Sequence, residues 1–222
     1  PGSQRLRQLH AGDDRLVEAT SPAGAVVNLS GLHSYDTDGD PLTWSWTNSV
    51  GDEVATTPEV SVALAIGTHV FTLTANDGLG GIGTDTVVVT VADTVAPTVT
   101  ITAPLAQGYP FGAAILVTFA CTDSGSGIAT CVGDLPTGAA LPTGVGGAFT
   151  FTVTATDVAG LSTSVAVPYS ITQPCTAGSY LAAPGDEACT LAPAGSYVDA
   201  PGATSATLCA PGSYSPAPGA EQ

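Results

Sequence analysis

The chain has 222 residues, with 19 acidic residues against 3 basic ones and a formal net charge of −16. All three basic residues are arginines that precede residue 16, so the rest of the chain offers no Lys or Arg side chain. This distribution excludes nucleic acids and anionic membrane surfaces as partners, because both are bound through Lys and Arg. No apolar run approaches the roughly 20 residues that a membrane-spanning helix needs.

Residues 14–172 have the pattern of short β-strands separated by turns. Apolar and polar side chains alternate, as in half-buried strands, at residues 42–47, 68–74 and 149–154. Clusters of Asp, Asn, Gly and Ser, typical of turns, lie at residues 36–41, 76–78, 123–127 and 157–160. Short strands with regularly spaced turns predict an all-β fold made of β-sandwiches.

Two boundaries divide this pattern. Residues 91–97 separate two sets of strands, and Pro97 suits a linker or an edge strand because proline cannot donate to a central ladder. A second change of pattern occurs at Gln173. We therefore expect four parts: an N-terminal segment 1–13, a sandwich 14–92, a second sandwich 93–172 and a tail 173–222 with little regular structure.

The tail contains an internal repeat. Gly-Ser-Tyr recurs at an interval of 17 residues, at 178–180, 195–197 and 212–214, and Pro-Gly pairs follow in the same register. The first repeat carries Cys175 and Cys189, whereas the second has Ala192 and Ala206 at the corresponding positions. Paired loss is expected when two cysteines form a disulfide, because the loss of only one would leave a free thiol. The repeat therefore predicts a Cys175–Cys189 disulfide.

The other three cysteines follow from this assignment. Cys209 begins the third repeat, and its partner position would be residue 223, so we expect an unpaired thiol orphaned by truncation or processing. Cys121 and Cys131 are then expected to pair across the turn between them in the second sandwich. The alternative is that all five cysteines are reduced. Disulfides favour an oxidising, extracellular compartment.

Three regions resemble known families. Residues 14–92 resemble a PKD (polycystic-kidney-disease) domain of the bacterial secreted type, through residues 26–31, 34–46 and 67–78. Residues 93–172 are similar to hyalin-repeat or bacterial immunoglobulin-like modules, and the tail is similar to ephrin-receptor-like Cys repeats, although one repeat has lost both cysteines. These resemblances imply two tandem immunoglobulin-like β-sandwiches and a disulfide-stapled tail in a secreted or surface protein. None of them implies catalysis.

An acidic turn is the first candidate for a binding site. Asp36, Asp38 and Asp40 place three carboxylates on one turn, and such hard oxygen ligands suit Ca²⁺. The alternative is that these side chains only shape the turn. Asp93 in the linker is a further candidate ligand for a shared Ca²⁺. Asp77 and Asp157, which close strands, are interpreted as structural.

Aromatic side chains offer a second candidate. Trp44 and Trp46 lie on the same face of one expected strand and could form an exposed platform for sugars. The alternative, more common in sandwiches, is that one packs in the core and its neighbour at the rim. Catalytic motifs such as a nucleophile elbow, a phosphate-binding loop or a zinc-binding His pair are absent from the sequence. We therefore expect a chain that is not an enzyme on its own.

Two functional hypotheses follow. The first is an extracellular structural or adhesive protein, a surface stalk or filament subunit, whose partners are copies of itself or neighbouring modules of a longer surface protein. Residues 1–13 could then pair with an open sheet edge of a neighbour. The second is an accessory module of a secreted hydrolase that binds polysaccharide or collagen through Trp44 or Trp46.

Overall fold

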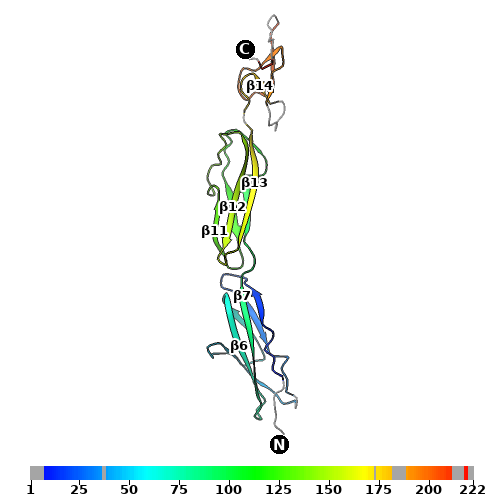
Figure 1. Cartoon of the computed structure of the whole chain (residues 1–222), viewed down its shortest axis with the longest axis vertical. Helices are drawn as coiled ribbons and strands as arrows, with labels where there is room; N and C mark the ends of the chain where they lie inside the picture. Colours follow the sequence, from blue (N-terminus) through cyan, green and yellow to red (C-terminus); the bar gives the residue numbers. More distant parts are fainter. Residues whose placement is uncertain (1–7, 37–38, 173, 182–188, 212–217, 220–222) are drawn as a thin grey trace. The chain divides into compact units, whose positions relative to one another are not determined.

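The computed structural model describes residues 8–36, 39–172, 174–181, 189–211 and 218–219. Every regular element within these residues is a β-strand (Figure 1), which confirms the prediction of an all-β fold of immunoglobulin-like sandwiches. The chain divides into two compact units. The first contains residues 1–98, 122–130 and 155–163, and the second contains residues 99–121, 131–154 and 164–222.

Two sheets built from residues 15–92 form the first sandwich. The larger has five strands in the order β1 (Arg15–Glu18), β7 (Ile82–Ala92), β6 (Gly67–Asn76), β3 (Thr43–Asn48) and β4 (Glu53–Ala55). The smaller pairs β2 (Ala25–Ser30) with β5 (Glu59–Leu64). β1 runs parallel to β7, whereas β6 and β7 form a long antiparallel hairpin (Figure 1).

Alternation along the strands supplies the core of this sandwich. In β6, Phe71 and Leu73 are buried while the threonines between and beside them face outward, as the period-two pattern predicts. In β2, Leu29 is buried while the neighbouring Asn28 is exposed. Trp46 is fully buried among these side chains, and the partly buried Trp44 packs against the same cluster.

Residues 8–11 pack on this sandwich rather than forming a free N-terminal arm. Gln8 pairs with Tyr35 in an isolated bridge, and Ala11 is only 1% exposed. The Ala11 N–H donates to Asp85 Oδ2 at 2.8 Å. Residues 1–7, which include two of the arginines, lie outside the described residues.

The strands from β8 to β13 form two further sheets. One has the order β11 (Ile128–Gly133), β12 (Gly147–Asp157), β13 (Ser162–Thr172) and β9 (Gly108–Pro110), and the other pairs β10 (Thr118–Thr122) with β8 (Thr98–Ala103). Their core is made of Val117, Leu141, Phe151 and Val153. A disulfide joins Cys121 to Cys131, and both residues pack against this core.

Each described repeat of the tail forms the same small hairpin. β14 (Ser179–Tyr180) pairs with β15 (Thr190–Leu191), and β16 (Ser196–Tyr197) pairs with β17 (Thr207–Leu208), in the same register 17 residues later. The contact between successive repeats recurs as well. The Gly202 N–H donates to the Cys175 carbonyl at 2.8 Å, and the Gly219 N–H donates to the Ala192 carbonyl at the same distance.

The cysteines of the tail fit this recurrence. A disulfide joins Cys175 to Cys189, and Cys175 is 1% exposed. Ala192, at the corresponding position of the second repeat, is also fully buried. A small apolar side chain can fill this buried position, which explains how the second repeat keeps its hairpin without a disulfide. Cys209, at the third such position, has a free thiol.

Candidate metal site and an aromatic hollow

Three aspartates from separate segments converge within the first unit. Asp93 directly follows β7, Asp123 directly follows β10, and Asp157 is the last residue of β12. One carboxylate oxygen from each lies within 4.8 Å of the other two. All three residues belong to the first unit, because that unit includes the turns at residues 122–130 and 155–163.

Hydrogen bonds from Ser126 fix the Asp93 carboxylate. The Ser126 N–H and Oγ donate to Asp93 Oδ2 at 2.7 and 2.5 Å, and the Val95 N–H donates to Asp93 Oδ1 at 3.1 Å. These donors, the Ser126 hydroxyl foremost, hold the pKa of Asp93 below its ordinary value of 3.8, because they favour the ionised carboxylate. Asp93 is therefore a fixed anion at neutral pH.

Gly125 permits this close approach. A Cβ atom at this position would lie 2.4 Å from both Cγ and Oδ1 of Asp93, closer than carbon side chains pack. The turn also binds Asp123, because the Gly127 N–H donates to Asp123 Oδ2 at 2.6 Å. The turn at residues 123–127 thus donates hydrogen bonds both to its own Asp123 and to Asp93 of the linker.

Asp157 has a buried oxygen without a partner. Its side chain is 2% exposed, and the Leu161 N–H donates to Oδ1 at 2.8 Å. No described group donates a hydrogen bond to Oδ2. Asp77 at the end of β6 is built in the same way, with Oδ1 accepting from the Gly81 N–H at 2.9 Å and Oδ2 buried and unpartnered. Among the described residues, however, Asp77 belongs to no comparable acidic group.

Within the part of the chain that the structure describes, no Lys or Arg side chain balances the charge of the cluster. Arg15 is the one arginine among the described residues, and its guanidinium donates to the carbonyls of Asp13 and Asn28. Glu18, which contributes a further carboxylate beside Asp93, accepts hydrogen bonds from the N–H and Oγ1 of Thr94 at 2.9 and 2.5 Å. The cluster is therefore strongly anionic, and its oxygen ligands suit a hard cation.

The acidic turn singled out in the sequence is only partly described. Asp36 and Asp40 are half-buried on either side of residues 37–38, and Asp38 lies outside the described residues. Asp93 was a candidate from the sequence, but Asp123 and Asp157 were not joined to it, because their proximity depends on how two distant turns fold. The available signal was an Asp at or directly after the end of each of two strands, together with the Asp in the linker.

Of the two interpretations of the tryptophans, the structure favours packing in the core over an exposed platform. Trp46 is 0% exposed and lies in the core of the first sandwich, so it cannot contact a ligand. Trp44 is partly buried and packs against the same core. A platform made of both side chains is excluded for Trp46, and the alternative of core packing applies, because the face on which they alternate is the inner face of β3.

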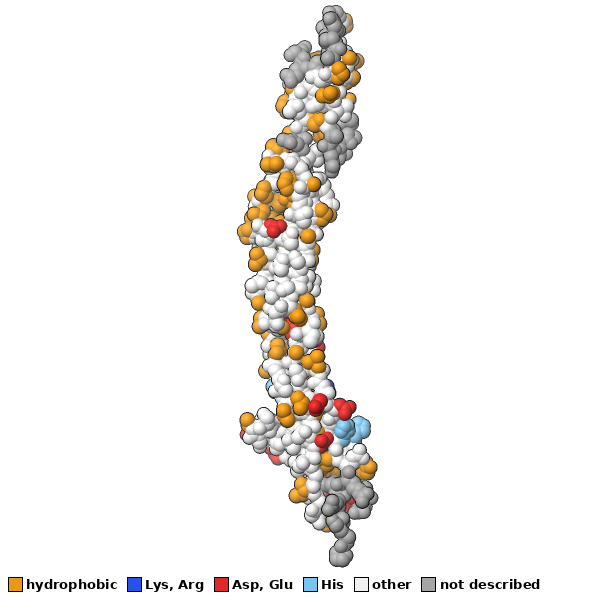
Figure 2. Space-filling model, viewed as in Figure 1, with side chains coloured by type: hydrophobic (Ala, Val, Ile, Leu, Met, Phe, Trp, Pro, Cys, Tyr) orange, Lys and Arg blue, Asp and Glu red, His pale blue; other side chains and the backbone are white. Residues whose placement is uncertain are grey.

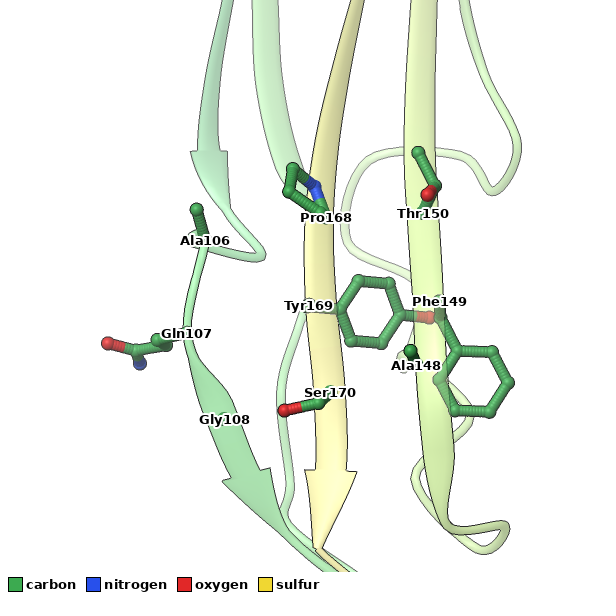
Figure 3. Close-up of a pocket in the computed structure, with 9 residues that line it drawn as sticks. All are labelled: Ala106, Gln107, Gly108, Ala148, Phe149, Thr150, Pro168, Tyr169 and Ser170. Atoms are coloured by element: carbon green, nitrogen blue, oxygen red, sulfur yellow. The ribbon is translucent and has the colours of Figure 1, made fainter. Parts of the chain in front are cut away.

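An aromatic hollow lies instead on the second unit, over β9, β12 and β13. The rings of Phe149 and Tyr169 stack with centroids 5.5 Å apart and an interplanar angle of 24°, and Figure 3 shows them side by side on neighbouring strands. Gln107 and Ser170 add polar groups to the lining. Partial burial, and to a smaller extent the Asp134 charge, raise the pKa of Tyr169, so its hydroxyl is protonated at neutral pH.

The remaining surface carries scattered apolar groups. Figure 2 shows them as separate orange areas on the face in view, and strongly exposed examples are Val26, Val50 and Leu208.

Acidic and His side chains meet near His10, whose ring nitrogens lie 4.0 Å from Asp13 Oδ1 and 3.9 Å from Asp85 Oδ2. Among the described residues, no helix is long and apolar enough to cross a membrane.

No family model matches the chain, and no curated protein matches it. Similar solved structures include Drosophila N-cadherin EC1-4, at 13% identity and a TM-score of 0.36, where the match covers 76% of this chain and 50% of that one. The titin domains z1z2 in complex with telethonin match at 16% identity and a TM-score of 0.43, covering 73% of this chain and 91% of that one. The fibronectin(III)-like modules of Clostridium thermocellum CbhA match at 18% identity and a TM-score of 0.29, covering 74% of this chain and 93% of that one. The chain spans about half the length of the N-cadherin fragment, and these likenesses concern the fold alone.

Proposed function

We propose that this chain is a non-enzymatic extracellular structural protein that serves as a stalk or as a subunit of an extracellular filament. The observation that carries the proposal is the recurrence in the tail. Successive repeats form the same hairpin and the same backbone hydrogen bond, from Gly202 to Cys175 and from Gly219 to Ala192. Such repetition builds an elongated stack in which each unit contacts its neighbours.

Disulfides support an extracellular location. Cys121–Cys131 and Cys175–Cys189 are both present in the structure, and disulfides persist in oxidising compartments. The high negative charge keeps such a protein soluble at the concentrations that a surface layer or fibre requires. The resemblance of residues 14–92 to a bacterial secreted PKD domain, and of the next region to a hyalin repeat, fits this role.

Electron microscopy tests the proposal. Native material would be released from its source without reductant and imaged by negative stain. Regular filaments or chains of modules are expected for a filament subunit, and separate rods for a stalk. Compact particles under all conditions would contradict both forms of the proposal.

A deletion then tests how copies meet. Removing residues 1–7 leaves the packing of Ala11 and the Gln8–Tyr35 bridge in place, whereas removing residues 1–13 would also disturb the first sandwich. If the N-terminal residues add a strand to a neighbour, the shorter deletion abolishes filaments and leaves the melting temperature unchanged. Filaments that form normally without residues 1–7 would exclude this mode of assembly.

Binding of polysaccharide is a second candidate function, favoured by the aromatic hollow. Stacked, partly exposed rings such as Phe149 and Tyr169 can pack against the apolar face of a sugar, while Gln107 and Ser170 offer polar contacts. Co-sedimentation of the chain with insoluble polysaccharides tests this function. Binding that is lost in Phe149→Ala supports it, and equal binding by Phe149→Ala and the parent chain contradicts it.

A further inference from the structure

We propose that Asp93, Asp123 and Asp157 bind one divalent cation, and that this cation is Ca²⁺. The inference goes beyond the structural role proposed above and does not depend on it. Three observations on these residues carry it: an unpartnered buried oxygen, an uncompensated cluster of charge, and a set of ligands made only of carboxylates.

The buried oxygen is the first observation. Asp157 is 2% exposed, its Oδ1 is bonded to the Leu161 N–H, and no described group donates to its Oδ2. Buried carboxylates are normally hydrogen-bonded, paired with a basic group or bound to a metal, because an isolated buried charge is very costly. The Asp157 carboxylate lies in the acidic cluster, with an oxygen within 4.8 Å of oxygens from Asp93 and Asp123.

The charge of the cluster is the second observation. Carboxylates this close repel one another, so protons or a cation must compensate them. Ser126 donates two hydrogen bonds to Asp93, which favour the ionised form and oppose protonation there. No Lys or Arg follows Arg15 in the sequence, and the Arg15 guanidinium donates to carbonyls elsewhere. Among the described residues, no basic side chain compensates the cluster, and a bound cation would supply the missing positive charge.

The kind of ligand identifies the cation. Zinc sites in proteins are built mainly on Cys and His, and this cluster contains neither. Mg²⁺ keeps several water molecules in a strict octahedron, whereas Ca²⁺ accepts more protein oxygens in a looser geometry. Two of the three carboxylates are buried, Asp93 at 7% and Asp157 at 2% exposure. A site built from buried protein oxygens suits Ca²⁺ better than hydrated Mg²⁺.

Calorimetry of the full chain provides the first test. CaCl₂ is titrated into calcium-free protein and into the variants Asp157→Asn and Asp77→Asn. Asparagine keeps the Oδ1 acceptor that each turn uses, so both variants alter only the oxygen that lacks a partner. Asp157→Asn is expected to bind one Ca²⁺ fewer per chain than the parent. Asp77→Asn, the matched control, is expected to bind as many as the parent.

Thermal unfolding with and without Ca²⁺ separates a ligand from a structural aspartate. In chelator, Asp157→Asn is expected to melt at the same temperature as the parent or higher, because one of three repelling charges is gone. In saturating Ca²⁺ it is expected to melt lower than the parent, because it no longer gains stability from the ion. The difference in melting temperature between variant and parent thus depends on Ca²⁺, whereas a purely structural Asp157 would give the same difference in both conditions.

Several results would overturn the proposal. The first is a parent chain that neither binds Ca²⁺ nor gains stability from it. The second is an Asp157→Asn variant that binds Ca²⁺ and is stabilised by it as fully as the parent. The third is an Asp77→Asn variant that loses Ca²⁺ binding as completely as Asp157→Asn does. A larger stabilisation by Mg²⁺ than by Ca²⁺ at equal concentration would overturn the identity of the ion. None of these results depends on whether the chain forms filaments, so the test is independent of the structural role.

Discussion

Ser126 holds the carboxylate of Asp93 through two hydrogen bonds, from its N–H at 2.7 Å and from its Oγ at 2.5 Å. The same Oγ accepts a hydrogen bond at 3.0 Å from the N–H of Ala159. One serine therefore connects three segments that are distant in sequence: the residue after β7, the turn after β10 and the turn after β12. The order of the acidic cluster depends on this side chain.

Ser126→Ala is expected to loosen these connections. The variant loses both bonds made by Oγ while the backbone bond to Asp93 remains, and each intramolecular hydrogen bond is worth about 1 kcal/mol. Thermal unfolding should show a lower melting temperature than that of the parent. Ser124→Ala, an exposed position in the same turn, is the matched control and should leave the melting temperature within experimental error. Equal melting of the two variants would contradict the assigned role of Ser126.

Gly125→Ala is expected to be damaging for a steric reason. The added Cβ would lie 2.4 Å from Asp93 Cγ, so either the turn or the Asp93 side chain must move. Overpacking of this kind costs about 1–3 kcal/mol. Gly144→Ala is the control, because a Cβ there meets no atom within 4 Å and its backbone is not restricted to glycine. A Gly125→Ala variant that melts at the same temperature as Gly144→Ala and the parent would show that the clash is relieved without cost.

Acid is expected to weaken the attachment of Asp93. Its pKa is lowered in the folded chain, chiefly by the Ser126 hydroxyl, so the unfolded chain binds its proton more readily. The contribution of Asp93 to stability is therefore complete above its ordinary pKa of 3.8 and is lost as the pH falls through the lower folded value. The measurement is the free energy of unfolding in calcium-free buffer as the pH is lowered from about 5, where carboxylates begin to bind protons. Over this range, Asp93→Asn should lose less stability than the parent. Identical slopes in the two proteins would contradict this expectation.

The strand pattern was accessible from the sequence because burial in a sandwich imposes a period of two. Phe71 and Leu73 alternate with threonines in the sequence and with outward-facing threonines in the structure. The repeat alignment likewise pairs Cys175 with Cys189, which the structure joins by a disulfide. Both features depend on neighbours within one strand or one repeat, so local spacing is enough to find them.

The acidic cluster was not accessible in the same way. Asp123 and Asp157 each resemble an ordinary turn aspartate, and each does bond to its own turn, through Gly127 and Leu161. What sets them apart is their approach to Asp93, which requires two distant hairpin turns to fold against the residue after β7. Asp77 shows the same local motif without such neighbours among the described residues, so the motif alone does not predict the site.

The two disulfides are expected to stabilise different parts of the chain. Cys121 and Cys131 pack against the core of Phe151 and Val153, whereas Cys175 and Cys189 close a loop within the tail. The double variant Cys121→Ala/Cys131→Ala should lower the unfolding transition of the sandwich strands by about 2–3 kcal/mol, from loss of loop closure. The core contacts of the two sulfurs are lost in addition.

The double variant Cys175→Ala/Cys189→Ala is the matched control, because it gives the first repeat the alanines that the second repeat carries at the corresponding positions. Its sandwich transition should be unchanged, since Ala192 shows that alanine fits the buried position of the repeat. Far-ultraviolet circular dichroism during thermal unfolding follows the β-strands, and the long strands all lie in residues 15–172, so it reports this transition. If both double variants lowered the sandwich transition equally, the tail and the sandwich core would unfold as one cooperative unit. That result would contradict the prediction, because the two disulfides stabilise separate sets of contacts in the structure.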